Sequence, residues 1–150
     1  MKVGFLGLGK LGLPSALAME SKGHTIYGYD INIKVLQAIR NKELTYKEKW
    51  ANELLNKSKI NLVEISDLVK NSEMIFVPIQ TPHDPKFEGI TLLTEERADF
   101  DYTWLRQGMK SLDAATPARK FGEIYLGISP APLPFKQIYT TISNKHVYVL

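Results

Sequence analysis

Three glycines near the N-terminus have the spacing of a phosphate-binding turn. Gly7, Gly9 and Gly12 form the pattern G-x-G-x-x-G within the segment GFLGLGKLGLP. The first glycine permits a tight turn, the second lets the backbone approach a pyrophosphate, and the third lets the following helix pack closely against a strand. The helix N-terminus supplies free N–H groups and the positive end of the dipole, which attract a diphosphate. The predicted cofactor-binding residues of this turn are Gly7, Gly9, Lys10, Leu11 and Gly12. Helix packing alone is the alternative role for the glycines, and a solvated side chain is the alternative for Lys10.

An acidic residue follows where a dinucleotide site needs one to hold a ribose. Asp30, 18 residues after Gly12, ends the segment HTIYGYD. A carboxylate accepts hydrogen bonds from ribose hydroxyls, whereas a 2′-phosphate would be repelled by about 4 kcal/mol per pair of unit charges at about 4 Å and an effective dielectric of about 20. The sequence therefore favours NAD over NADP. Lys34, one helical turn further on, adds positive charge to this predicted site. Capping of the next helix is an alternative or additional role for Asp30.

A third candidate segment, MIFVPIQTP, ends in residues that should lie beside the glycine turn. Its first seven residues, 74–80, predict a buried strand. The carboxyl end of such a strand meets the glycine-bearing strand at the switch point where open α/β sheets bind ligands. Gln80, Thr81 and Pro82 therefore complete the predicted cofactor-binding residues. An ordinary turn that ends the strand is the alternative interpretation.

Alternating strands and helices must position these residues. KVGFL (2–6) predicts a buried strand, 11–22 a helix with Pro14 in its first turn and Gly23 at its end, 24–30 a second strand and 32–41 a second helix. The later predicted elements are helix 47–56, a strand near 59–63, a helix near 65–72, strand 74–80, helix 101–112 with Asp101 as its cap, and strands 122–128 and 146–150. Such alternation predicts a Rossmann-type, doubly wound α/β fold with a mainly parallel sheet and helices on both faces. Residues 81–100 predict a long functional loop.

Composition excludes several other classes of protein. The chain has 150 residues, 44% of them hydrophobic and 23% charged, which fits one globular domain. The net charge of +3 comes from basic residues scattered among acidic ones, so no nucleic-acid partner is expected. The absence of cysteine excludes disulfides, thiolate metal sites and a cysteine nucleophile within the chain. The three histidines, His24, His83 and His146, are too far apart in sequence to form a ligand pair, so no metal site is predicted.

Membrane insertion and secretion are not predicted either. No run of about 18 apolar residues occurs, as a transmembrane helix would require. Lys10 interrupts the N-terminal apolar run, and the glycines around it would weaken the helix that a secretion signal forms. A cytoplasmic protein is expected.

These segments together resemble the NAD-binding domain of the UDP-glucose/GDP-mannose dehydrogenase family. KVGFLGLGKLGLPSALAMESKGHTIYGYDINIKVLQAI looks like the family's opening, and NKELTYKEKWANELL is similar to the segment after its second helix. MIFVPIQTPHDP resembles the family's strand ending in Thr-Pro, and ADFDYTWL resembles its next helix start. The resemblance extends from about residue 2 to residue 112.

The resemblance implies an NAD-dependent oxidoreductase that acts on CH–OH groups. The family oxidises the C6 alcohol of a nucleotide-linked sugar to a carboxylate and passes two hydrides in turn to two NAD molecules, through a thio-intermediate on a cysteine of a later domain. Because this chain has no cysteine, residues 1–150 are expected to be a single NAD-binding domain of a partial dehydrogenase that lacks the substrate and catalytic domain. UDP-glucose is the expected type of substrate of the full enzyme, and this chain alone is expected to be inactive. Assembly into a homo-oligomer is left open.

Two regions depart from the family pattern. Lys49 and Trp50 replace a Pro-Gly pair, and the family's Ser-Thr-x-x-Pro-Gly-Thr pattern near the nicotinamide is matched only at Ser129 and Pro134. The sequence therefore does not decide whether residues 113–142 form a working nicotinamide pocket. Two alternatives to a nucleotide-sugar dehydrogenase remain: the cofactor domain of a β-hydroxyacid dehydrogenase, whose opening also resembles GFLGLGKLGLPSA, and a non-catalytic nucleotide-binding module.

Overall fold

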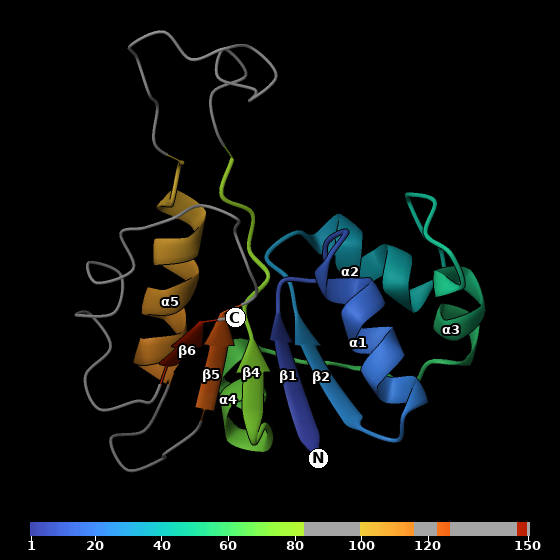
Figure 1. Ribbon diagram of the computed structural model, residues 1–150, viewed down its shortest axis with the longest axis horizontal. Helices are drawn as coiled ribbons and strands as arrows, with labels where there is room; N and C mark the ends of the chain where they lie inside the picture. The colour runs from blue at the N-terminus through green and yellow to red at the C-terminus, as the bar shows by residue number, and fades with distance from the viewer. Residues whose placement is uncertain (83–99, 116–122, 127–146, 150) are drawn as a thin grey trace, which may run out of the picture.

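The fold is built around a parallel sheet of six strands. A computed structural model describes residues 1–82, 100–115, 123–126 and 147–149, and Figure 1 shows their arrangement. The strands lie in the order β3-β2-β1-β4-β5-β6, and every neighbouring pair is parallel. This is the order of a doubly wound dinucleotide-binding fold, in which the strand order reverses between the first and fourth strands. The predicted fold class is confirmed.

Most predicted elements occur close to their expected bounds. The strands are β1 (Lys2–Leu6), β2 (Thr25–Tyr29), β3 (Asn61–Leu62), β4 (Met74–Phe76), β5 (Glu123–Leu126) and β6 (Val147–Val149). The helices are α1 (Gly12–Ser21), α2 (Ile33–Arg40), α3 (Ala51–Lys57), α4 (Ile65–Asn71) and α5 (Thr103–Ala115). Gly23 has a φ of +89° and donates to the carbonyl of Glu20, so it ends the first helix as expected.

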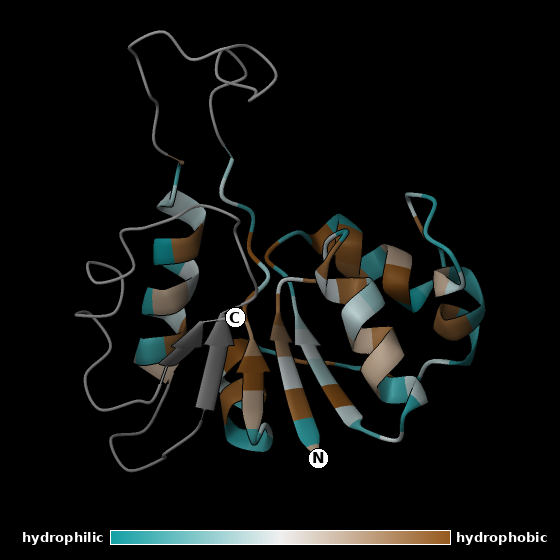
Figure 2. Ribbon diagram, viewed as in Figure 1, coloured by the Kyte–Doolittle hydropathy of each residue, from teal (hydrophilic) through white to brown (hydrophobic). Residues whose placement is uncertain are grey.

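Two cores lie on opposite faces of the sheet, because side chains alternate along each strand. Val3 and Phe5 of β1 belong to the core formed with α1, α2 and α3. Leu6, next in the same strand, belongs to the core that contains residues of α4, β4 and α5. Figure 2 shows that β1 and β4 are largely apolar and that α5 carries hydrophilic residues on the side turned away from the sheet. Helices on both faces are therefore held by separate apolar clusters.

Two predicted boundaries are wrong. The strand predicted over 74–80 ends at Phe76, because Pro78 has no N–H for a ladder and the N–H of Ile79 donates to the carbonyl of Val77 in a tight turn. The helix predicted from residue 47 begins at Ala51, since Trp50 before it has a left-handed φ of +64°. Most of the predicted loop 81–100 lies outside the described residues.

A hydroxyl group buried beneath the sheet gives a prediction about stability. Ser72 is buried, and its Oγ has no hydrogen-bond partner among the described residues. Ser72→Ala is expected to raise the free energy of unfolding by about 1 kcal/mol, since it removes an unsatisfied polar group. Denaturant unfolding would measure this, with Ser21→Ala, at an exposed serine, as the control. A loss of stability in Ser72→Ala would contradict the prediction.

In the described part of the chain, no helix has the length and apolarity needed to cross a bilayer. The same residues contain no group of three or more His, Asp and Glu side chains placed to hold a metal ion.

Candidate functional site

The glycine turn links β1 to α1 at the carboxyl edge of the sheet. Gly7 follows the strand with a φ of +108°, a conformation that favours glycine, and its N–H donates to the carbonyl of Tyr29 at 2.8 Å. The N–H of Leu13 donates to the carbonyl of Gly9 at 3.0 Å, at the start of the helix. A Cβ atom added to Gly9 would have no other group within 4 Å. Gly9 therefore faces open space, as an approaching ligand requires.

Gly12 has a different role within the same motif. It is buried as the first residue of α1, and an added Cβ would overlap the carbonyl oxygen of Gly7 and lie 2.9 Å from Cγ of Pro78. Real Cβ atoms do not come this close to backbone. The absence of a side chain at Gly12 is what lets α1 start against the turn and against the segment after β4.

Asp30 lies one residue beyond β2 and is held by two backbone N–H groups. Its Oδ2 accepts from Leu8 in the glycine turn at 2.7 Å, and its Oδ1 accepts from Asn32 at 2.8 Å. The cap of α2 is Asn32, whose side chain accepts from the N–H of Lys34 at 3.0 Å. The alternative in which Asp30 caps this helix is therefore wrong. Each carboxylate oxygen can accept about two hydrogen bonds, so acceptor sites remain for a ligand.

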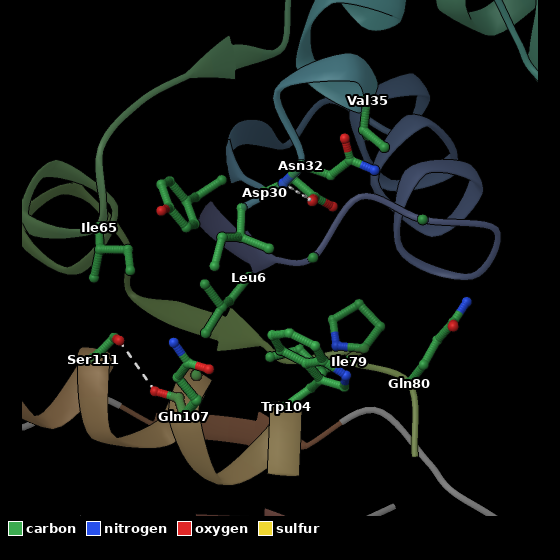
Figure 3. A pocket seen from close by; sticks show the side chains of 16 residues that line it. Leu6, Asp30, Asn32, Val35, Ile65, Ile79, Gln80, Trp104, Gln107 and Ser111 are labelled. Atoms are coloured by element: carbon green, nitrogen blue, oxygen red, sulfur yellow. Dashed lines mark hydrogen bonds between the residues drawn. The ribbon is translucent and has the colours of Figure 1, made fainter. Parts of the chain in front are cut away.

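A cavity of about 440 Å³ opens beside the turn and the carboxylate. Gly7, Gly9, Asp30 and Gln80 of the predicted residues line it. Figure 3 shows Asp30 and Asn32 on one wall and Trp104, Gln107 and Ser111 of α5 on the opposite wall. The lining residues that were not predicted are Leu6, Tyr29, Ile31, Asn32, Val35, Ile65, Pro78, Ile79, Trp104, Gln107, Gly108 and Ser111. The volume is in the range of sites for small molecules and cofactors.

The other predicted residues do not line this cavity. Lys10 and Leu11 are exposed in the turn before α1, and Lys34 is exposed near the start of α2. Thr81 is partly buried, and Pro82 is exposed, its carbonyl accepting from the N–H of Asp101 at 2.7 Å. These five assignments stay predictions, as does the contact of the four lining residues with a cofactor. Gly12 does not line the cavity either, and its predicted cofactor contact likewise stays a prediction.

A helix face supplied the wall that sequence reasoning missed. Trp104, Gln107, Gly108 and Ser111 recur at the three- and four-residue spacing of one face of α5. The expected apolar face, with Leu105, Met109 and Leu112, is buried in the core. The neighbouring face, with Trp104, Gln107, Gly108 and Ser111, resembles an ordinary solvated helix face in the sequence. Only its position next to the carboxyl edge of the sheet could have indicated that it lines the cavity.

Two titratable groups close to these elements have shifted pKa values. Burial, and next the negative charge of Glu48, raise the pKa of Tyr46, whose hydroxyl donates to the carbonyl of Gly9 at 3.4 Å. Hydrogen bonds from the side chain and backbone of Thr103 lower the pKa of Asp101. Oδ1 of Asp101 accepts from the Thr103 N–H at 2.9 Å, so Asp101 stabilises the start of α5 as the sequence predicted.

The site is built for binding. A helix N-terminus and an open glycine turn suit a diphosphate, and Asp30 is placed to accept hydrogen bonds from hydroxyl groups. Most of the remaining lining is apolar, with a few polar groups among it, which is typical of a cofactor pocket. Among the described lining residues, none is a cysteine, histidine or lysine, so no nucleophile is paired there with such a base.

Comparison with protein families gives one match that covers most of the chain. The model of the UDP-glucose/GDP-mannose dehydrogenase family, NAD binding domain, matches residues 1–112. Two curated relatives are UDP-N-acetyl-D-mannosamine dehydrogenases. The protein from Methanococcus maripaludis strain S2 is 28% identical over 151 residues, covering 99% of this chain and 33% of the relative. The one from Pyrococcus horikoshii is 30% identical over 86 residues, covering 55% of this chain and 21% of the relative.

Solved structures share the fold. A GDP-mannose dehydrogenase from Pseudomonas aeruginosa matches with a TM-score of 0.76 and 16% identity, over 99% of this chain and 35% of that chain. A UDP-glucose dehydrogenase from Pyrobaculum islandicum matches with a TM-score of 0.73 and 15% identity, over 99% and 34%. At these identities the likeness shows the fold alone. The chain spans about a third of the length of its curated relatives from Methanococcus maripaludis.

Proposed function

The chain belongs to the UDP-glucose/GDP-mannose dehydrogenase family, and we propose that it supplies the NAD-binding part of a nucleotide-sugar dehydrogenase. The observation that carries this proposal is the meeting of the open Gly9 turn with the Asp30 carboxylate at one 440 Å³ cavity. The family match favours this function over the β-hydroxyacid dehydrogenase alternative. A non-catalytic nucleotide-binding module would use the same site, so binding of NAD alone does not separate it from a part of a dehydrogenase.

The residues have separate tasks in this proposal. The backbone N–H groups around Gly9 and at the start of α1 bind the pyrophosphate, and Gly7 sets the turn that aims them. Asp30 accepts from the adenosine ribose and also fixes the turn through Leu8. When bound, NAD supplies the acceptor for hydride. The family's nicotinamide pattern falls at Ser129 and Pro134, outside the described residues, so the residues around that end of the site stay a prediction.

The proposed substrate of the whole protein is a nucleotide-linked sugar oxidised at C6. The sequence resemblance favours UDP-glucose, whereas the curated relatives are named for UDP-N-acetyl-D-mannosamine. The shared class is a UDP-linked hexose. Because the chain has no cysteine, we propose that it binds NAD without oxidising either sugar by itself, in a cytoplasmic enzyme whose other residues carry the chemistry.

Asp30→Ala tests the ribose contact and the preference for NAD. The substitution removes the acceptor for the ribose and the bond that holds Leu8, so NAD affinity is expected to fall about 10- to 100-fold, as for the loss of one or two hydrogen bonds to a charged group. NADP affinity should fall less, because the repulsion of its 2′-phosphate is removed as well. Calorimetric titration of the purified chain with NAD and NADP would measure both.

The matched control removes a carboxylate away from the cavity. Asp67 is exposed in α4 and does not line the site, so Asp67→Ala should bind NAD like the wild type. Failure of the wild-type chain to bind NAD would contradict the proposed function. Equal NAD affinity in Asp30→Ala and the wild type would contradict only the role given to Asp30.

A further inference from the structure

The cavity continues past Asp30 to a wall that no step of the proposed function uses. On one side lie Asp30, Asn32 and Val35, and on the other lie Trp104 and Gln107 of α5 (Figure 3). Apolar side chains line the space between these walls: Leu6, Ile65 and Ile79. An apolar slot with an indole at its edge suits a planar aromatic group.

Gln107 brings a hydrogen-bonding group into this slot. Its side-chain amide points from α5 into the cavity in Figure 3 and has no hydrogen-bond partner among the described residues. Ser111, one turn further along the helix, donates its hydroxyl hydrogen to the main-chain carbonyl of Gln107 at 3.0 Å. The hydroxyl donor is thus already used, and the Gln107 amide is the free donor and acceptor of this wall.

The position of the slot indicates which part of a dinucleotide would reach it. The phosphates belong at the start of α1 and the ribose at Asp30, so the group attached to that ribose extends along the cavity toward α5. That group is a purine base, with aromatic faces and an edge that carries an amino group next to a ring nitrogen. A primary amide matches such an edge, because its carbonyl accepts from the amino group while its NH₂ donates to the ring nitrogen.

We infer that Gln107 recognises the amino-bearing edge of the adenine base and makes the site selective for adenine dinucleotides. This inference rests on the proposed function, since it requires that NAD binds in this cavity. It assigns a base-recognition role to a residue of the α5 wall, which the proposed function leaves without one. Trp104, 51% exposed at the same wall, provides the adjacent aromatic surface.

The experiment compares NAD with 1,N6-etheno-NAD, in which the amino group and the adjacent ring nitrogen are blocked. The wild-type chain is expected to bind NAD about 10-fold more tightly than the etheno analogue, as for loss of one paired amide contact. Gln107→Leu keeps the approximate size of the side chain and removes the amide. It should weaken NAD binding about 10-fold, weaken binding of the analogue little, and bring the ratio of the two dissociation constants near one.

The control and the outcomes separate this inference from the proposed function. Gln37 is an exposed glutamine of α2 outside the cavity, and Gln37→Leu should keep the wild-type ratio. If Gln107→Leu lowers both affinities equally, or changes neither, the inference is overturned while NAD binding stands. If the wild-type chain binds neither dinucleotide, the proposed function fails and the inference fails with it.

Discussion

Gly9→Val is expected to abolish measurable NAD binding, with a loss of affinity of at least about 100-fold, while the chain stays folded. An added Cβ at Gly9 meets no other group within 4 Å, so the valine side chain has room in the unliganded protein. The pyrophosphate must enter this same space to approach the backbone of the turn. The two methyl groups of valine would hold the pyrophosphate away from the N–H groups of α1. Calorimetric titration with NAD would measure the loss.

The fold of this variant must be checked separately. Far-ultraviolet circular dichroism and denaturant unfolding should match the wild type, apart from the small cost of a β-branched residue near a helix start. Ala18→Val adds the same two methyl groups at an exposed position of α1 and should leave NAD affinity unchanged. A folded Gly9→Val chain with wild-type affinity would show that this glycine serves the turn alone.

Gly12→Ala is expected to act on stability, with a loss of about 3 kcal/mol in the free energy of unfolding. The added Cβ would overlap the Gly7 carbonyl and crowd Pro78, and neither is the end of a flexible side chain that can move aside. Overpacking of this kind typically costs 1–3 kcal/mol, and backbone contacts belong at the upper end. The loss is a large part of the stability of a domain that folds with roughly 5–15 kcal/mol.

Urea unfolding of Gly12→Ala and of Gly9→Ala would make the comparison. The second variant adds the same methyl group to the same turn, where it has space, and should stay within about 0.5 kcal/mol of the wild type, as is usual away from special features. If the two variants lose the same stability, the division of roles between these glycines is wrong.

The sequence predicts the layered fold well because its signals are local and agree with one another. The two central strands, β1 and β4, are short apolar runs, and Gly7 and Pro78 follow them within two residues. The helices after β1 and β2 each carry an apolar face. What it predicts poorly depends on a single backbone angle or on contacts between distant segments. The early end of β4 follows from Pro78, and the late start of α3 follows from the φ of Trp50.

The site shows the same division between local and distant signals. The glycine spacing and Asp30 could be read from the sequence because the strand and helix around them are adjacent in the chain. The α5 wall could not, since Trp104 and Gln107 lie more than 70 residues beyond Asp30 and meet it only through the order of the strands. The alternative role of Asp30 as the cap of α2 was two residues too early, because Asp30 and Asn32 are both good cap residues and only the structure shows that Asn32 accepts from the N–H of Lys34.

Trp50, the residue before α3, has a left-handed backbone although it is not a glycine. It stands where the sequences that this chain resembles carry glycine, and it keeps the turn before α3 at an expense of about 1–2 kcal/mol for a residue with a Cβ. The surroundings therefore impose the backbone shape, and the glycine of the pattern only makes that shape inexpensive. A lineage can lose such a signature residue and retain the architecture, at the cost of part of its tolerance to later mutations.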